Sequence, residues 1–247
     1  MQMQSQVALI TGAASGIGQA TAEVLARYGA SVMLADSNRE YGETVAAQIR
    51  QVGGRAHFVC TDVSDTSSVR QAVQLIREVF ADAPIGLLVN AAGVLRHGYL
   101  PELAEADWDL SLDVNLRGTF LCCQAVLPLM LEQRRGVIVN ISSSGARGCP
   151  GRYPAYVAAK TGVLGLTLAM ANAFREKQQP ISIFALCPDK VDTPMGEQAF
   201  RDFRGYAPSL SDRSRMLVSN QIAQIILRLM EPEWAIASGS IIDLKVV

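Results

Sequence analysis

The sequence predicts a three-layer α/β/α fold built on a doubly wound parallel sheet of about seven strands, with helices on both faces. Short β-branched runs alternate with longer amphipathic stretches along the 247 residues, and strands joined by single helices pair in parallel through right-handed crossovers. Hydrophobic residues make up 49% of the chain and charged residues 18%, as expected when a sheet is buried on both faces. No linker-like segment divides the chain, so we expect residues 1–247 to form a single domain.

Each strand is expected where a short apolar run meets a turn signal, and each helix where apolar residues recur with helical period. The expected strands are Val7–Thr11, Ser31–Ala35, Ala56–Cys60, Leu87–Asn90, Val137–Ser142, Ile181–Leu186 and Ser240–Leu244. The expected helices are Gly16–Tyr28, Arg39–Val52, Thr66–Phe80, Asp107–Glu132 and Ala155–Lys177. The long stretch Asp189–Arg215 interrupts this alternation, and we expect it to be a substrate-binding loop because loops of that length are usually functional.

Charge and hydropathy exclude several classes of function. The net charge is −1, with 22 basic and 23 acidic residues, so no electrostatic surface for nucleic acid or anionic lipid is expected. No apolar run reaches the roughly 18 residues that a membrane span needs. Residues 1–6 lack the basic and apolar regions of a signal peptide. We therefore expect a cytoplasmic protein without a nucleic-acid or membrane partner.

The cysteines and histidines do not form a metal-binding pattern. No CxxC pair occurs, and neither His57 nor His97 has partners at the spacing of a zinc site or a hydrolase triad. We expect no metal, and we expect the cysteines to be small buried hydrophobes in a reducing compartment. These cysteines are Cys60, Cys122, Cys123, Cys149 and Cys187.

A glycine-rich turn follows the first expected strand directly. The segment Thr11–Gly18 reads TGAASGIG and opens a helix. Glycines allow the backbone to approach a pyrophosphate, and the helix N-terminus offers N–H groups and a positive dipole end. The position of the turn between a strand and a helix therefore predicts dinucleotide binding, although tight strand-to-helix turns need glycine in any case.

Asp36 ends the second expected strand and predicts which dinucleotide is bound. A carboxylate there can accept hydrogen bonds from the adenosine ribose and repels a 2′-phosphate, so NAD is favoured over NADP. Two alternatives remain open from the residues alone. Asp36 could simply begin a turn or cap the helix that begins at Arg39, and Arg39 could reach a phosphate.

A serine, a tyrosine and a lysine supply the candidate chemistry. Ser143 follows the fifth expected strand, and Tyr156 and Lys160 lie four residues apart on one helix face. A nearby ammonium stabilises phenolate and is expected to lower the pKa of Tyr156, which makes the phenol a usable acid or base. Ser143 can hydrogen-bond an oxygen on which charge develops during hydride transfer.

Together these motifs resemble the classical short-chain dehydrogenase/reductase family over essentially the whole chain. The resemblance implies a Rossmann-type core that binds NAD(H) or NADP(H), usually in a homotetramer, and passes a hydride between the nicotinamide and an alcohol or carbonyl carbon. The motifs that carry it are TGAASGIG at 11–18, Asp62-Val63, NAAG at 90–93, VNLRG around Asn115, Ser143, YVAAK at 156–160 and Pro188 with Val191-Asp192-Thr193.

The resemblance also implies roles for individual residues. Tyr156 would be the acid/base, Lys160 would bind the nicotinamide ribose, Ser143 would hold the substrate oxygen and Asn115 would help to order a water chain. Asn115 could instead only bend its helix, and Asp62 could cap the helix that follows. The other implied cofactor-binding residues are Gly12, Ser15, Gly16, Ile17, Gly18, Asp36, Asp62, Val63, Asn90, Ala91, Gly93, Val191 and Thr193, besides Tyr156 and Lys160.

Two departures from the family pattern concern the nicotinamide site and the assembly. Asp189 stands where the family usually has a glycine after Pro188, which would cost backbone freedom if the glycine φ is needed. The tail Ile242–Val247 replaces the usual Asp-Gly-Gly ending, which weakens the inference of a tetramer over a dimer. Neither departure removes a catalytic group.

Three functions remain compatible with the sequence. The first is an NAD-dependent dehydrogenase acting on a secondary alcohol, and the second is an NADPH-dependent carbonyl or 3-oxoacyl-thioester reductase. The third is a nucleotide-binding sensor or scaffold on the same fold. Arginines around the expected pocket could bind an anionic substrate or could simply pair with surface carboxylates. These arginines are Arg96, Arg147, Arg152, Arg201 and Arg204.

Overall fold

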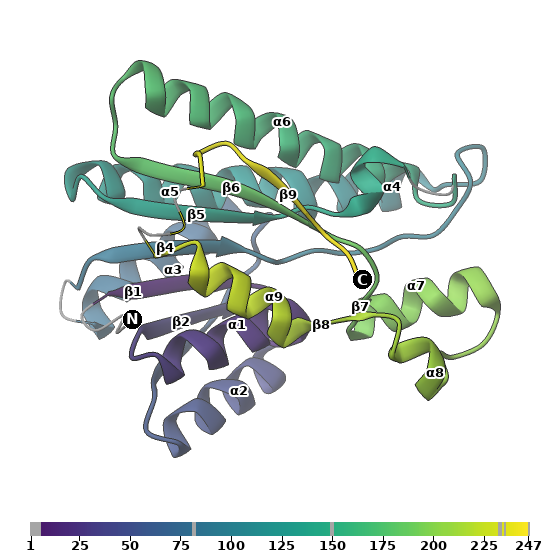
Figure 1. Cartoon of the computed structure of the whole chain (residues 1–247), viewed down its shortest axis with the longest axis horizontal. Coiled ribbons are helices and arrows are strands. Elements are labelled where there is room, and N and C mark those ends of the chain that lie inside the picture. Colours follow the sequence, from purple (N-terminus) through teal and green to yellow (C-terminus); the bar gives the residue numbers. More distant parts are fainter. Residues whose placement is uncertain (1–5, 81–82, 149–150, 232–233, 235, 247) are drawn as a thin grey trace.

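The computed structural model describes residues 6–80, 83–148, 151–231, 234 and 236–246. Seven strands form one parallel sheet in the order β3-β2-β1-β4-β5-β6-β9, with the helices on either side of it (Figure 1). The predicted fold class is thereby confirmed. The strands are β1 Val7–Thr11, β2 Ser31–Asp36, β3 Arg55–Cys60, β4 Ile85–Asn90, β5 Gly136–Ile141, β6 Ile181–Pro188 and β9 Ile241–Leu244.

The strand order reverses between β1 and β4, which are neighbours in the sheet but far apart in the chain. In open α/β sheets a crevice forms beyond the carboxyl ends of the strands at such a switch point. In this chain the glycine turn follows β1, and Ala91 to Gly93 follow β4. The topology therefore brings both of these segments to the same crevice.

Alternate residues along each strand enter separate apolar cores on the two faces of the sheet. In β1, Ala8 and Ile10 belong to the core under α1 Gly16–Arg27, α2 Arg39–Gln51 and α9 Ser219–Arg228. Val7 and Leu9 belong to the opposite core. The helices of that second core are α3 Thr66–Val79, α5 Gly118–Glu132 and α6 Pro154–Glu176, with α4 Glu105–Leu112 packed on α6.

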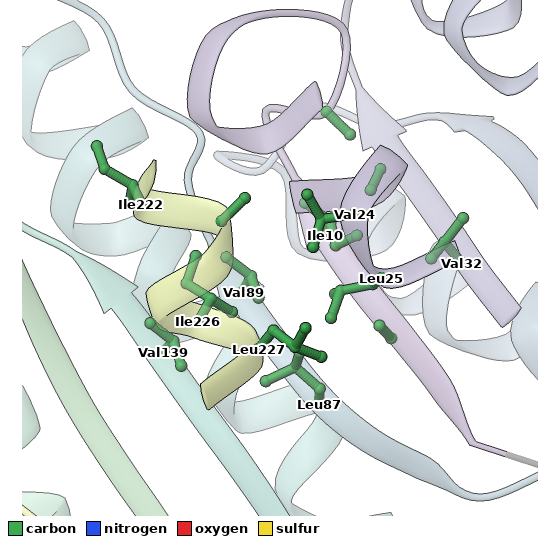
Figure 2. Packing of buried hydrophobic residues seen from close by; sticks show 14 of the residues in the cluster. Ile10, Val24, Leu25, Val32, Leu87, Val89, Val139, Ile222, Ile226 and Leu227 are labelled. Carbon is green, nitrogen blue, oxygen red and sulfur yellow. The ribbon is translucent and has the colours of Figure 1, made fainter. Parts of the chain in front are cut away.

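The first core joins the two ends of the chain. Figure 2 shows α9 lying beside α1, with Leu227 and Ile226 close to Leu87 and Val89 of the sheet and Leu25 nearby. Burial of each such side chain contributes about 1.5–3 kcal/mol relative to exposure. Packing of α9 on the sheet and on α1 therefore holds the C-terminal part of the chain against its N-terminal half.

The stretch predicted as a loop, 189–215, is instead largely ordered in helices, so this part of the prediction was wrong. It contains β7 Val191–Asp192, α7 Pro194–Arg204 and α8 Leu210–Arg213, and β7 pairs with β8 Leu217–Val218. The Thr193 side chain caps α7 and Gly205 ends it with a φ of 80°. The residues that suggested a loop are thus helix start and stop signals. Figure 1 shows α7 and α8 beyond the strand ends.

The helix predicted over Asp107–Glu132 is divided by a π-helical turn at Asp113–Arg117 between α4 and α5. By length and composition, two helical stretches, Glu105–Glu132 and Pro154–Glu176, could cross a membrane, although no single apolar run suggested it. Both are packed on the sheet, where Val126 and Phe174 are buried. Core packing therefore accounts for part of their apolar character.

The cysteines differ in burial according to their place in the fold. Cys122, Cys123 and Cys187 are buried as expected, and burial raises the pKa of the Cys123 thiol to about 12. Cys60 is exposed, so its predicted burial was wrong. It ends β3, which lies at one of the two edges of the sheet formed by the described residues. Cys149 lies outside the described residues.

Candidate active site

A cleft of about 1180 Å³ opens at the carboxyl ends of β1, β2, β4, β5 and β6, with α7 forming part of its wall. The cleft brings together most of the residues that the sequence marked as a site. These are Gly12, Ser15, Gly16, Ile17, Gly18, Asp36, Asp62, Val63, Ala91, Gly93, Ser143, Tyr156, Lys160, Val191 and Thr193. Asn90 and Asn115 are buried and do not line it.

The glycine turn needs its glycines for close backbone contact. Gly12 has a φ of 66°, and a Cβ there would lie 2.7 Å from the Ala92 backbone. A Cβ on Gly18 would lie 2.2 Å from the carbonyl oxygen of Gly12. The Ser15 side chain makes no capping bond at the start of α1, so the first N–H groups of that helix are free to face an anion in the cleft.

Thr11 ties this turn to the segment after β4, a role that the sequence analysis missed. Its hydroxyl oxygen accepts hydrogen bonds from the N–H groups of Ala91 at 3.1 Å and Ala92 at 3.2 Å. The signal in the sequence is the threonine that begins TGAASGIG, directly before the first glycine of the turn. Thr11 sets the distance between the two walls of the cleft.

Asp36 faces the cleft and is held by two backbone N–H groups. Its carboxylate accepts from Ala14 at 3.0 Å and from Asn38 at 2.9 Å. The cap of α2 is Asn38, whose side chain accepts from the Tyr41 N–H, so Asp36 is not the cap. Arg39 lies outside the cleft lining. The carboxylate of Asp36 is therefore the charged group that the end of β2 presents to the cleft.

Asp62 lies in the cleft wall after β3, and the capping role considered for it belongs to another residue. Asp65 caps α3 by accepting from the N–H groups of Ser67 and Ser68. Asp62 instead accepts from the N–H of Ser64 at 2.9 Å. Val63 packs against Gly118, where a Cβ would lie 2.7 Å from its side chain.

The two asparagines from the motifs act beneath the cleft. The Asn90 amide donates to Asn140 on β5 at 2.8 Å and so joins two strands. Asn115 accepts from the Val94 N–H at 3.1 Å and donates to the Val94 carbonyl at 2.9 Å. A Cβ on Gly93 would lie 2.7 Å from the Asn115 amide oxygen. Asn115 thus fixes the segment after β4 from within the π-helical turn.

Ser143 begins the short helix Ser144–Arg147 with an extended backbone. Its Oγ accepts a hydrogen bond from the Gly145 N–H at 3.1 Å. Since that bond uses only an acceptor lone pair, the hydroxyl proton remains able to donate to an oxygen in the cleft. Two bonds hold this segment to α6. Ser142 donates to the Lys160 carbonyl and Thr161 donates to the Ala146 carbonyl, at 2.9 and 2.8 Å.

Lys160 is a buried cation beside Tyr156. Its side chain is only 4% exposed, and its ammonium lies 5.7 Å from the centroid of the Tyr156 ring. The ammonium donates one hydrogen bond within the described residues, to the Ile141 carbonyl at 2.9 Å. Burial lowers the pKa of Lys160 to about 8. A buried ammonium with one protein acceptor can take further acceptors from a ligand.

The arginines considered for substrate binding are largely engaged by protein groups. Arg96 pairs with Asp107, Arg147 with Asp243 and Arg201 with Glu197. Arg152 donates to the Tyr99 hydroxyl and to the Asp202 carbonyl, and the Arg204 guanidinium lies 5.4 Å from the Phe203 ring centroid. Within the described part of the chain no three potential metal ligands gather.

A family model described as short chain dehydrogenase matches residues 6–203. The chain belongs to this family. The short-chain dehydrogenase sequence is 34% identical over 245 residues to a 3-oxoacyl-(acyl-carrier-protein) reductase of Thermotoga maritima, covering 99% of this chain and 98% of the relative. It is 37% identical over 241 residues to a D-threitol dehydrogenase of Mycolicibacterium smegmatis, covering 97% and 91%. A solved levodione reductase superposes with a TM-score of 0.90 at 29% identity, covering 99% and 97%.

Short-chain dehydrogenases use NAD(P), and the cleft of this family member fits such a cofactor. Gly12 and Gly18 allow the turn to pack closely on the Ala92 backbone and on itself, which leaves the start of α1 in the cleft wall, where a helix N-terminus can bind a pyrophosphate. The Lys160 ammonium has donors to spare for the ribose hydroxyls. The cleft runs from Asp36 to Tyr156, so one bound dinucleotide could reach both ends.

Proposed function

We propose that this short-chain dehydrogenase transfers a hydride between NAD(H) and a secondary alcohol or its ketone. The observation that carries the proposal is the convergence of Ser143, Tyr156 and the buried Lys160 ammonium on the cleft that the glycine turn opens. A sensor or scaffold has no need of a buried cation beside a phenol, because burying an ammonium costs free energy. The bound nicotinamide would supply the hydride acceptor or donor.

Each side chain has a task in the direction of alcohol oxidation. Tyr156, as phenolate, takes the proton of the substrate hydroxyl while the hydride leaves the carbinol carbon. Charged Lys160 favours that phenolate, and its remaining N–H donors hold the ribose. The Ser143 hydroxyl donates a hydrogen bond to the reacting oxygen, because its own oxygen already accepts one from the Gly145 N–H. In the reverse direction Tyr156 returns the proton to the carbonyl oxygen.

The position of Asp36 supports NAD over NADP. A 2′-phosphate about 4 Å from a carboxylate would be disfavoured by about 1–4 kcal/mol between fully hydrated and partly buried conditions. The two backbone N–H groups that hold the carboxylate would keep it from turning away. Arg39, the basic residue close by in sequence, lies outside the cleft lining.

We propose a cytoplasmic homo-oligomer of single-domain subunits, a dimer or a tetramer. Family membership supports the oligomer, and so do Phe120 on α5 and Leu168 on α6, which are 43% and 45% exposed. Light scattering of the purified protein would give the subunit number.

The reaction can be tested without knowing the physiological substrate. Purified protein is incubated with NAD or NADP and a panel of polyols, hydroxy acids and aliphatic and aromatic secondary alcohols, and reduced cofactor is followed by absorbance. We expect at least one alcohol to reduce NAD, with NADP reduced more slowly. Faster reduction of NADP across the panel would contradict the cofactor assignment. No reduction by any alcohol, and no oxidation of NADH by the matching ketones, would contradict the proposed function.

A further inference from the structure

The residue that departs from the family pattern beside the nicotinamide site, Asp189, places a carboxylate in the wall of the cleft. It follows β6, and its N–H donates to the Leu244 carbonyl of β9 at 2.9 Å. Its φ is not positive, so the expected cost of replacing a glycine there does not arise. The backbone therefore accommodates the Asp189 side chain at this position.

The Asp189 carboxylate lies close to the reacting end of the cleft. Its Oδ1 accepts a hydrogen bond from the Ser144 hydroxyl at 3.0 Å, and Ser144 follows Ser143 directly. Oδ2 accepts no hydrogen bond from the residues that the structure describes. A carboxylate with a free oxygen in a cleft favours a hydrogen-bond donor or a cation.

Asp189 forms no ion pair within the described residues. Arg147, on the same short helix as Ser144, pairs with Asp243. Arg96 lines the cleft but pairs with Asp107. Lys190 also contributes to the cleft wall but makes no ion pair within the described residues. Lys190 is therefore tested separately below.

Part of the cleft wall is apolar. Met195, Phe200 and Phe203 of α7 line the cleft, together with Leu95 and Tyr153. None of the α7 residues is fully buried. The cleft therefore carries the Asp189 carboxylate together with apolar side chains of α7.

We propose that Asp189 selects the substrate: a secondary alcohol with a hydroxyl or ammonium group on the carbon next to the carbinol, and an apolar substituent on its other side. A carboxylate at that neighbouring carbon is rejected by charge repulsion. This inference rests on the proposed function and narrows its substrate class, and it replaces the anionic substrate that the arginines suggested.

Three compounds on one skeleton test the proposal: 3-phenylpropane-1,2-diol, 1-amino-3-phenylpropan-2-ol and 3-phenyllactate. They differ only in the group beside the carbinol, which is a neutral hydroxyl, an ammonium or a carboxylate. The kcat/KM with NAD and the dissociation constant from the enzyme–NADH complex are measured at pH 7. We expect the diol and the amino alcohol to be preferred over phenyllactate by about ten-fold or more, the effect of one nearby charge under partly hydrated conditions.

Variants separate the charge from the shape of the site. Asp189→Asn should reduce the preference for the diol over phenyllactate by about ten-fold, whereas Asp189→Glu and Ser144→Ala keep the charge and should retain the preference. Lys190→Met should not weaken it. NADH binding by each variant reports whether the cleft is still folded. An unchanged preference in Asp189→Asn, a wild-type preference for phenyllactate, or no binding of any of the three compounds would overturn the inference.

The two proposals can fail separately. If the wild type reduces NAD with other alcohols but shows no charge discrimination, only the role of Asp189 is wrong. If no alcohol in any panel is oxidised and no matching ketone is reduced, the proposed function itself is wrong, and the binding measurements still judge Asp189.

Discussion

Replacing the buried lysine by methionine, Lys160→Met, should make the stability of the cofactor-free protein respond to pH differently from the wild type. Burial lowers the pKa of Lys160 from 10.5 to about 8, so the folded state binds this proton less tightly than the unfolded state. Below pH 8 the buried ammonium lowers the free energy of unfolding by its full amount. This destabilisation decreases as the pH rises and vanishes above 10.5, the ordinary pKa of lysine in the unfolded chain.

The size of the effect follows from the shift in pKa. At 1.36 kcal/mol per unit, the charged lysine costs the folded protein about 3 kcal/mol at neutral pH. Methionine removes that cost but leaves the Ile141 carbonyl without its donor, which costs about 1–3 kcal/mol. These two terms nearly cancel at pH 7, so the difference between pH values is the informative quantity. Between pH 7 and 10 the wild type should gain roughly 2–3 kcal/mol relative to the variant.

Urea unfolding of both proteins at pH 7, 8, 9 and 10 gives the comparison, because other titrating groups contribute equally and cancel in the difference. Lys177→Met, an exposed lysine just after α6, is the matched control and should show no such trend. The variant should also bind NADH more weakly. A pH-independent difference between wild type and Lys160→Met would refute the claim that the ammonium is buried at a cost.

Three further changes test other parts of the site. Asp36→Asn should lower the ratio of NAD to NADP affinity by about ten-fold or more, since it removes the charge that repels a 2′-phosphate. Fluorescence titration with NADH and NADPH measures this ratio, and an unchanged ratio would show that Asp36 does not select the cofactor. Gly18→Ala should destabilise the protein by about 1–3 kcal/mol, because the new Cβ would lie 2.2 Å from the Gly12 carbonyl oxygen. Urea unfolding measures the change, and a free energy of unfolding equal to that of the wild type would contradict the close packing of the turn. Arg152→Met should speed tryptic cleavage within α7, after Arg201 and Arg204, because Arg152 donates to the Asp202 carbonyl at 2.9 Å. The control is Arg70→Met on the exposed surface. Equal rates of cleavage in the wild type and in Arg152→Met would show that Arg152 does not hold α7.

Local periodicity was sufficient to predict the central sheet and its cores. Ala8 and Ile10 face one core while Val7 and Leu9 face the other, so β1 is recognisable as a continuous apolar run between turn signals. Cys60 shows the limit of this reasoning. An apolar run does not reveal that its strand lies at the sheet edge, because the strand order is a property of the whole chain.

The candidate site residues could be located from the sequence because their spacing is local. Tyr156 and Lys160 share a helix face, and the glycine turn lies between one strand and one helix. The asparagine contacts were not predictable, since Asn115 bonds the Val94 backbone across the fold. The π-helical turn that holds Asn115 has no local signature either. The helices of 189–215 could have been found from their caps, because Thr193, Pro194 and Gly205 are ordinary boundary signals.

The central claim is that Tyr156 transfers the proton that accompanies hydride transfer, and Tyr156→Phe tests it most directly. The measurement is kcat for NAD reduction by the best alcohol of the panel, together with the dissociation constant for NADH. The account predicts that kcat falls by about 10²–10⁴-fold, the usual contribution of a general acid or base, while NADH binding is retained. Undiminished turnover by the phenylalanine variant would contradict it.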